Sequence, residues 1–291
     1  MLELIDSNWI LQYRSEILTE FFLTFKFFSY DFFYILVIAV GYWLRPGGRL
    51  FAHLGFLAPI STLINIILKN AFAIKSPDPD LYLIIGTDEI LGFPSWSSQI
   101  AAIFWGLIYL RSSVKFLKWL SVIMVILVMI SKVYLGVQTI PSVIAGLCFG
   151  LITIVVWKNK FIQNIVTGWF EGRYISYWLI FGLVLTIYYF VVITNFYSSL
   201  MIIPAGILIG YGLSLDNISR WSYNSNMFSA LHFAAIIFSF IMLIILFFAV
   251  PIIESNPIML VTSSLFKYCI ITYSMFTIFP KVQLAIIMPK K

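Results

Sequence analysis

The chain has 291 residues, of which 62% are hydrophobic and only 10% are charged, and its mean hydropathy is +1.01. A soluble globular domain carries roughly 25% charged residues, so this chain cannot cover a water-facing surface and lipid must be its solvent. Its net charge of +6 does not indicate nucleic-acid binding, because the basic residues are dispersed between apolar stretches and form no patch.

Apolar stretches that could cross a bilayer follow one another along the chain. Residues 9–27 come first and alternate apolar and charged positions at helical spacing, which favours an interfacial helix lying on the membrane. A spanning helix needs roughly 20 mostly apolar residues. About nine such helices are predicted, at residues 28–44, 50–70, 95–111, 117–134, 140–157, 175–194, 198–215, 228–250 and 258–279. We therefore expect an all-α, polytopic membrane helical bundle.

The charges between these stretches predict the orientation of the chain. If residues 45–49 are cytoplasmic, alternation of the spans puts 12 of the 18 basic residues on that side with only two acids, Glu171 and Asp216. The acids on the opposite side are Asp78, Asp80, Asp88, Glu89 and Glu254. The N-terminus is then outside and the C-terminus cytoplasmic, and the loops at 71–94 and 132–140 share the outer face.

Three short motifs lie in those two loops and at the start of the predicted third helix. They read Lys69, six residues, then Ser76-Pro77; Pro94-Ser95-Trp96-Ser97; and Ser131-Lys132, five residues, Gln138, three residues, then Ser142. Their order and spacing resemble the K-x6-R-P, P-S-G-H and S-R-x5-H-x3-D motifs of the type 2 phosphatidic acid phosphatase (PAP2) family. The similarity covers about residues 25–160, roughly half the chain.

The resemblance implies a PAP2-like core over residues 1–160, and residues 161–291 are expected to add a C-terminal transmembrane extension of four helices. In that family a histidine takes the phosphoryl group, an aspartate orients it, a second histidine protonates the leaving group, and Lys and two Arg hold the phosphate. The corresponding positions here are Gln138 for the nucleophile, Ser142 for the orienting group, Ser97 for the acid, and Ser76 and Lys132 for the arginines. Among the phosphate-holding residues, Lys69 and Ser95 match outright. Trp96 replaces a family glycine and would fill the former pocket or anchor at the headgroup level.

The substituted residues argue against the family reaction. A glutamine amide is not a nucleophile, and a serine needs an adjacent general base to attack phosphorus. The two histidines, His53 and His232, are placed by the predicted topology toward the cytoplasmic ends of their helices. We therefore expect a catalytically inactive relative without cofactor or metal. It would bind a phosphorylated or polyprenyl lipid at the outer face through Lys69, Ser95 and Lys132, or act as a membrane scaffold with protein partners or copies of itself.

Two other functions stay open at this point. One is a lipid-phosphate phosphatase or phosphotransferase with an altered mechanism through Ser95 or Ser97, acting on phosphatidate or polyprenyl pyrophosphate. The other is a transporter, which rests on the extra helices, on Lys267 within the last span and on the glycines near 198–215. The bacterial inner membrane is the expected location, by analogy with compact members of the family.

Two further groups of residues receive a plainer interpretation. The acids of the 71–94 loop invite a divalent-metal reading, but without histidine or a tight spacing pattern we expect a solvated acidic loop. Cys148 and Cys269 each sit within an apolar run, so we expect small buried hydrophobic residues and no disulfide.

Overall fold

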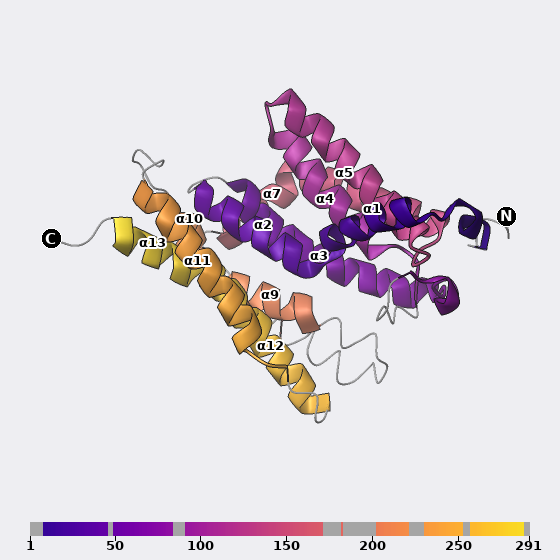
Figure 1. Cartoon of the computed structure of the whole chain (residues 1–291). Helices are drawn as coiled ribbons and strands as arrows, with labels where there is room; N and C mark the ends of the chain where they lie inside the picture. Colours follow the sequence, from indigo (N-terminus) through magenta and orange to yellow (C-terminus); the bar gives the residue numbers. More distant parts are fainter. Residues whose placement is uncertain are drawn as a thin grey trace. The chain divides into compact units, whose positions relative to one another are not determined.

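A computed structural model of the chain describes residues 8–45, 49–83, 91–170, 182, 202–220, 230–252 and 257–287. In this part of the chain the regular structure is helical, apart from one isolated β-bridge between Lys75 and Leu91 (Figure 1). The helices are α1 (Glu16–Lys26), α2 (Asp31–Leu44), α3 (Arg49–Phe72), α4 (Trp96–Arg111), α5 (Lys115–Tyr134), α6 (Ile140–Trp157), α7 (Lys160–Phe170), α9 (Ile202–Leu213), α10 (Leu215–Arg220), α11 (Ala230–Ala249), α12 (Pro257–Tyr273) and α13 (Phe279–Ile287), with 3-10 turns at Asn8–Tyr13 (η1), Phe27–Ser29 (η2) and Pro79–Leu81 (η3) and a π-helical segment at Ser274–Ile278 (η5).

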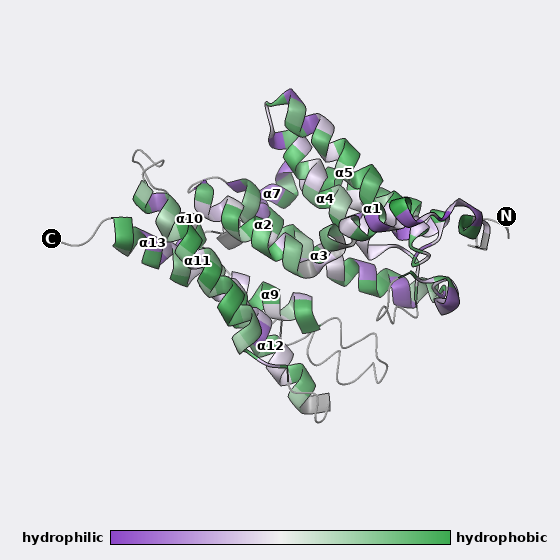
Figure 2. Cartoon of the chain, in the orientation of Figure 1, coloured by the Kyte–Doolittle hydropathy of each residue, from purple (hydrophilic) through white to green (hydrophobic). Residues whose placement is uncertain are grey.

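Five of the described helices are long and apolar enough to cross a membrane, and Figure 2 shows their hydrophobic colouring. They span Arg49–Phe72, Lys115–Tyr134, Ile140–Trp157, Ala230–Ala249 and Met259–Ile287. The last is one continuous 29-residue helical stretch that begins within α12 and runs through η5 and α13. The chain is therefore an all-α, integral multi-pass membrane protein, which confirms the predicted class at this level.

Other predicted spans are shorter in the structure. Helix α2 contributes Phe32–Leu44 and α9 contributes Ile202–Leu213 as apolar helices of fewer than 18 residues. Helix α4 has 16 residues, about 24 Å at 1.5 Å per residue, against a hydrocarbon core of about 30 Å. The predicted span at 175–194 lies outside the described residues except for Gly182.

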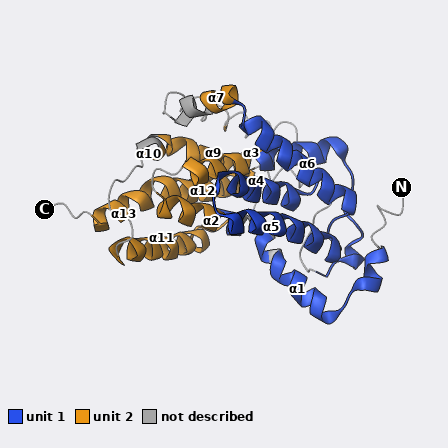
Figure 3. Ribbon diagram, turned by 90° about the horizontal axis from the view of Figure 1, so that it is seen from above, with its two compact units in different colours: residues 1–34, 61–159 blue, residues 35–60, 160–291 orange. Residues whose placement is uncertain are grey.

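The helices form two compact units, coloured separately in Figure 3. Unit 1 contains residues 1–34 and 61–159, and unit 2 contains residues 35–60 and 160–291. These are groups of residues in mutual contact, and the expected division into a core over 1–160 and an extension over 161–291 stays a prediction.

Unit 1 is built around α4. Every residue from Ser97 to Phe104 is buried, because α4 packs against both α5 and α6 and hydrogen-bonds to α3. Two glycines of α6 make the approach to α4 close. A Cβ at Gly146 would lie 2.3 Å from the carbonyl oxygen of Ser95, and one at Gly150 would lie 2.6 Å from the Cβ of Ala102. Small residues four apart let helix backbones meet in lipid.

Unit 2 has an aromatic core with polar anchors. The ring of Phe276 lies 4.8 Å from Tyr42 and 5.1 Å from Tyr211. The Tyr211 hydroxyl donates to the carbonyl of Ala52 (2.9 Å), and Trp43 Nε1 donates to the carbonyl of Met275 (2.9 Å). Met275 belongs to the π-helical segment η5, whose widened turn changes the hydrogen-bonding pattern of the backbone.

Close packing also explains two of the glycines near 198–215, Gly206 and Gly210. A Cβ at Gly206 would lie 2.9 Å from the carbonyl oxygen of Leu265, and one at Gly210 would lie 2.3 Å from that of Cys269. These glycines are four residues apart, so they lie on one face of α9 and admit the backbone of α12. They are accounted for by helix packing, without invoking a transport role.

The cysteine prediction was partly wrong. Cys148 and Cys269 are both free, but Cys148 is exposed on α6 and Cys269 is only partly buried. Cys148 lies on a different side of α6 from Gly146 and Gly150, which face α4, and an apolar exposed position is normal where lipid is the solvent.

Candidate functional site

The first and second motifs meet where the chain leaves α3 and enters α4. Lys75 forms an antiparallel bridge with Leu91, and the amide of Gly92 donates to the carbonyl of Ile74 (2.9 Å). Gly92 lies directly against Ser76, because an added Cβ would be 2.9 Å from the Ser76 Cα and 3.1 Å from its Oγ. The Ser76 Oγ is buried and forms no hydrogen bond. The position that would hold an arginine in the resembling family therefore carries a buried hydroxyl against a glycine.

The third motif joins this region through Ser142, in the first turn of α6. The Ser142 Oγ lies within hydrogen-bond distance of the carbonyl oxygen of Gly92 and of the Gln138 Oε1 (2.6 Å). One hydroxyl proton cannot serve two acceptors at once. If the Gln138 amide is turned so that its NH2 group donates to Ser142, the Ser142 hydroxyl is free to donate to the carbonyl of Gly92.

Ser95 forms the next link, at the start of α4. Its amide donates to the carbonyl of Ser142 (3.1 Å), so the N-terminal ends of α4 and α6 are held together. Its Oγ is the N-cap of α4, accepting from the Ser98 amide (3.5 Å) and bonding to the Ser98 hydroxyl (3.2 Å). Ser95 is fully buried and its hydroxyl is used in capping, which makes it a structural group more than an available nucleophile.

The turn after α5 fixes the other third-motif residues. The amides of Val137 and Gln138 both donate to the carbonyl of Lys132, at 3.1 and 3.2 Å. Gly136, which comes just before Val137, has φ +79°, a backbone conformation in which residues with a side chain are strained. Lys132 is 8% exposed and Gln138 is 2% exposed. The turn therefore presents two nearly buried polar side chains beside α6.

Lys69 and Ser97 come from helix ends that border the same region. Lys69 stands in the last turn of α3 and is 6% exposed. Asn65, one turn earlier on the same face, donates from Nδ2 to the carbonyl of Pro94 (3.2 Å), so this face of α3 is directed at the second motif. Ser97 is in the first turn of α4 and is 4% exposed.

A buried polar network between α3 and α4 was missed in the sequence analysis. The Gln99 Nε2 donates to the carbonyl (3.1 Å) and the hydroxyl (2.8 Å) of Ser61, and Gln99 Oε1 accepts from Asn65 Nδ2 (2.8 Å). All three residues are at most 1% exposed, and the Asn65 Oδ1 has no hydrogen-bond partner. The signal was the spacing of Ser61, Asn65 and Lys69, four residues apart on one face of an otherwise apolar helix.

Trp96 packs on α3 and α2. Its Nε1 donates to the Thr62 hydroxyl (3.0 Å), and its ring lies 6.4 Å from the ring of Tyr34 in an edge-to-face arrangement. The indole is thus anchored by protein contacts on the side of α4 that faces these two helices.

The described part of unit 1 has no histidine to serve as base or acid, because His53 and His232, the two histidines of the chain, belong to unit 2. Asp78 and Asp80 are exposed, and Asp88 and Glu89 lie outside the described residues. Within the described residues no group of three His, Cys, Asp or Glu side chains could hold a metal ion. The arrangement can donate and accept hydrogen bonds and offers two lysines, and its described groups include no histidine of the kind that the resembling family uses as nucleophile and acid.

Comparison of the chain with models of known protein families gives no match, and neither curated proteins nor solved structures give one. The resemblance to the PAP2 family stays a hypothesis that rests on the three motifs.

Proposed function

We propose that the protein is a catalytically inactive, PAP2-like membrane protein that binds a phosphorylated lipid through Lys69, Ser95 and Lys132. One observation carries the proposal: three motifs spread over residues 69–142 converge on one cluster. Ser76 lies against Gly92, Gly92 accepts from Ser142, and Ser142 bonds to Gln138 and to the amide of Ser95. This convergence supports the proposal, because a phosphate site built from three motifs requires them to lie together.

The two lysines favour an anionic head group. Each is less than 10% exposed, Lys69 in the last turn of α3 and Lys132 in the last turn of α5. A buried ammonium needs strong hydrogen-bond acceptors or an anion around it, and phosphate oxygens are charge-assisted acceptors. The proposal includes about nine spans, the motif loops on the outer face of a bacterial inner membrane, and a ligand class of phosphatidate or polyprenyl phosphate.

Catalysis has less support. Gln138 cannot act as a nucleophile, Ser95 is used as a helix cap, and Ser97 has no histidine in its unit. The side-chain contact between Gln138 and Ser142 (2.6 Å) nevertheless has the separation that a histidine–aspartate pair would need. A protein that keeps the family's backbone arrangement but has lost its catalytic residues would show both the missing catalytic groups and the retained Gln138–Ser142 contact.

Binding is tested with purified protein in neutral detergent. Affinity for phosphatidate and polyprenyl phosphate is compared with that for diacylglycerol and polyprenol of the same chain length. Lys69→Met and Lys132→Met each remove one charged hydrogen bond, worth about 1.5–3 kcal/mol, so phospholipid binding should weaken about tenfold or more. Lys115→Met is the matched control, since Lys115 is exposed at the opposite end of α5 from Lys132. Equal affinity for the phosphorylated and neutral lipids, or unchanged binding in both variants, would refute the proposal.

A phosphate-release assay separates the inactive protein from an altered phosphatase. Wild type should release no phosphate from phosphatidate or polyprenyl pyrophosphate, and turnover that Ser97→Ala abolishes would show an active enzyme instead. A restored variant tests the scaffold: activity confined to it would show that the fold around the site is intact. That variant carries Ser76→Arg, Ser97→His, Lys132→Arg, Gln138→His and Ser142→Asp.

A further inference from the structure

The N-terminal segment of the chain is fastened to the end of α5. The Tyr134 hydroxyl accepts from the Ser15 amide (3.0 Å), donates to the Ser15 carbonyl (3.2 Å) and lies 3.2 Å from the Thr19 hydroxyl. The ring of Phe22 packs 4.6 Å from the ring of Tyr134, in a small core with Leu135. One side of α1 is therefore fixed to the last turn of a membrane-spanning helix.

Arg14 adds a second attachment just before α1. Its guanidinium donates to the carbonyls of Leu81 and Tyr134. Gly136 leaves room for this contact, because a Cβ there would lie 2.2 Å from the Leu81 carbonyl oxygen and 2.9 Å from the Arg14 guanidinium. The segment is thus attached to the same turn that carries Gln138.

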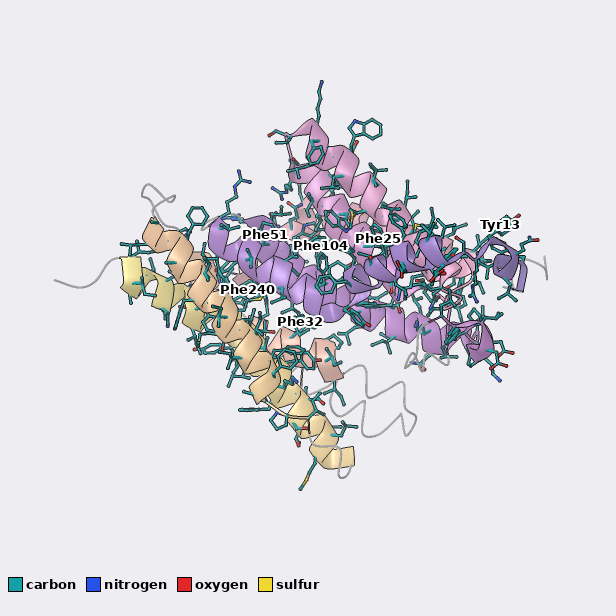
Figure 4. All side chains as sticks on the ribbon, viewed as in Figure 1. Tyr13, Phe25, Phe32, Phe51, Phe104 and Phe240 are labelled. Carbon is teal, nitrogen blue, oxygen red and sulfur yellow. The ribbon has the colours of Figure 1, made fainter. Side chains whose placement is uncertain are left out.

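The remainder of the α1 surface is divided into an apolar and a polar side. An α-helix turns by 100° per residue, so Ile17, Leu18 and Phe21 lie on one side of α1. All three side chains are exposed, Ile17 at 82%. Glu16 and Glu20 lie on the neighbouring arc with Thr24, and they are exposed too. Helix α1 therefore has three sides: one attached to the end of α5, one exposed and apolar, and one exposed that carries both acids together with the apolar Leu23. Figure 4 labels Tyr13 and Phe25 near either end of this segment.

The length of α1 and its position relative to the membrane boundary indicate what covers its apolar side. Helix α1 has 11 residues, about 16 Å, which is too short to cross a bilayer. It is attached to Tyr134, the last residue of the α5 span and so a residue at the membrane–water boundary. The exposed apolar surface of α5 leads up to this point through Ile123, Ile126 and Ile130.

We propose that α1 lies in the plane of the membrane surface, with Ile17, Leu18 and Phe21 inserted among the lipids and Glu16 and Glu20 in water. The occupant of the apolar side is the phospholipid surface itself. The side chains described as exposed and charged on α1, Glu16 and Glu20, are acidic, so the proposal assigns the binding to apolar burial. Trp9 and Tyr13, exposed in η1, extend the contact as interfacial aromatics.

The attachment has a consequence for the neighbouring turn. One side of α1 would contact lipid, and the other side is held by the hydrogen bonds of Tyr134 and Arg14. Helix α1 therefore connects the membrane surface to residues 134–138. This inference needs no ligand in the candidate site, so it stands or falls separately from the proposed function.

Spin labels on adjacent positions of α1 test the inference directly. Single cysteines are introduced as Ile17→Cys, Phe21→Cys, Glu16→Cys and Glu20→Cys in the full chain, with Cys148→Ser and Cys269→Ser removing the native thiols. The protein is reconstituted into phosphatidylcholine vesicles, and collision of each label with oxygen and with a water-soluble nickel complex is measured. We expect the labels at 17 and 21 to favour oxygen, at a depth of about 5–10 Å, and those at 16 and 20 to favour nickel.

The outcomes separate the alternatives. If the labels at positions 17 and 21 collide with nickel as often as those at positions 16 and 20, the helix lies in water and the inference is overturned. Shielding of 17 and 21 from both reagents would show that protein, such as a second copy of the chain, covers the face, and would overturn it too. Replacing a third of the phosphatidylcholine with phosphatidylglycerol should leave the depths unchanged, and a marked shift would contradict apolar burial as the source of binding.

Discussion

Substituting Gly146 with alanine tests the packing of α6 on α4 most directly. The new Cβ would lie 2.3 Å from the carbonyl oxygen of Ser95 and 3.0 Å from the Cβ of Ser98, whereas ordinary contact begins at 3.4 Å. The methyl group is roughly 1 Å too close to backbone, which cannot rotate away as a side-chain end could. The helices must separate at the point where Ser95 and Ser142 are joined.

Two opposing effects set the size of the change. Alanine is favoured over glycine in a helix interior by about 1 kcal/mol, whereas overpacking in a dense interior costs about 1–3 kcal/mol. Because the contact is with backbone, we expect overpacking to prevail and Gly146→Ala to lower the free energy of unfolding by about 1–2 kcal/mol. Reversible unfolding with SDS in mixed micelles, followed by circular dichroism, measures this value.

Gly106→Ala is the matched control, since it makes the same chemical change in the same helix pair. The Cβ at Gly106 would meet only the Ile154 side chain, with its Cδ1 at 2.5 Å, and that terminal methyl can move. We expect Gly106→Ala to leave stability unchanged or raise it by up to about 1 kcal/mol. If Gly146→Ala proves as stable as Gly106→Ala, the close approach of α6 to the Ser95 backbone is refuted.

Three further substitutions test other contacts. Gln99→Leu removes the buried bonds to Ser61 and Asn65, and SDS unfolding should show a loss of about 1–2 kcal/mol; an unchanged value would mean that the network contributes no stability. Tyr134→Phe should raise hydrogen exchange of the amides in residues 15–26 while leaving those of α6 protected, and equal exchange in both proteins would rule out the hydroxyl as the attachment of α1. Trp43→Phe keeps an aromatic six-membered ring but removes the pyrrole part of the buried indole and its bond to the η5 backbone. Unit 2 should be destabilised by at least about 0.5–1.5 kcal/mol for the lost bond, with a further loss for the cavity, measured by SDS unfolding; no change would show that the bond is dispensable.

Local features of the sequence were sufficient for much of the fold. Ser95 caps α4 and Thr139 caps α6 with Pro141 in its first turn, so these helix starts could be read from residue type. The amphipathic pattern near 9–27 corresponds to η1 and α1. The spacing within each motif is likewise a local property, which is why Ser76, Gln138 and Ser142 could be singled out before their positions were known.

The partners of these residues could not be derived in the same way. Nothing in the chain order indicates that Ser142 meets Gly92, that Gln99 joins Ser61 and Asn65, or that Trp43 bonds to the η5 segment 232 residues later. The 16-residue α4 also reads as a spanning helix from composition, yet from Ser97 to Phe104 it is buried on all sides by protein.

The sequence by itself determined that the chain is a helical membrane protein, because transfer from water to lipid depends on each residue's own side chain and sums along a segment. Only the tertiary structure decided which helix faces meet one another and which meet lipid. Hydrocarbon is as apolar as leucine, so hydropathy cannot distinguish a protein contact from a lipid contact. The distinction comes from glycines such as Gly146 and from buried polar pairs such as Gln99 with Asn65, whose value depends on a partner distant in the chain.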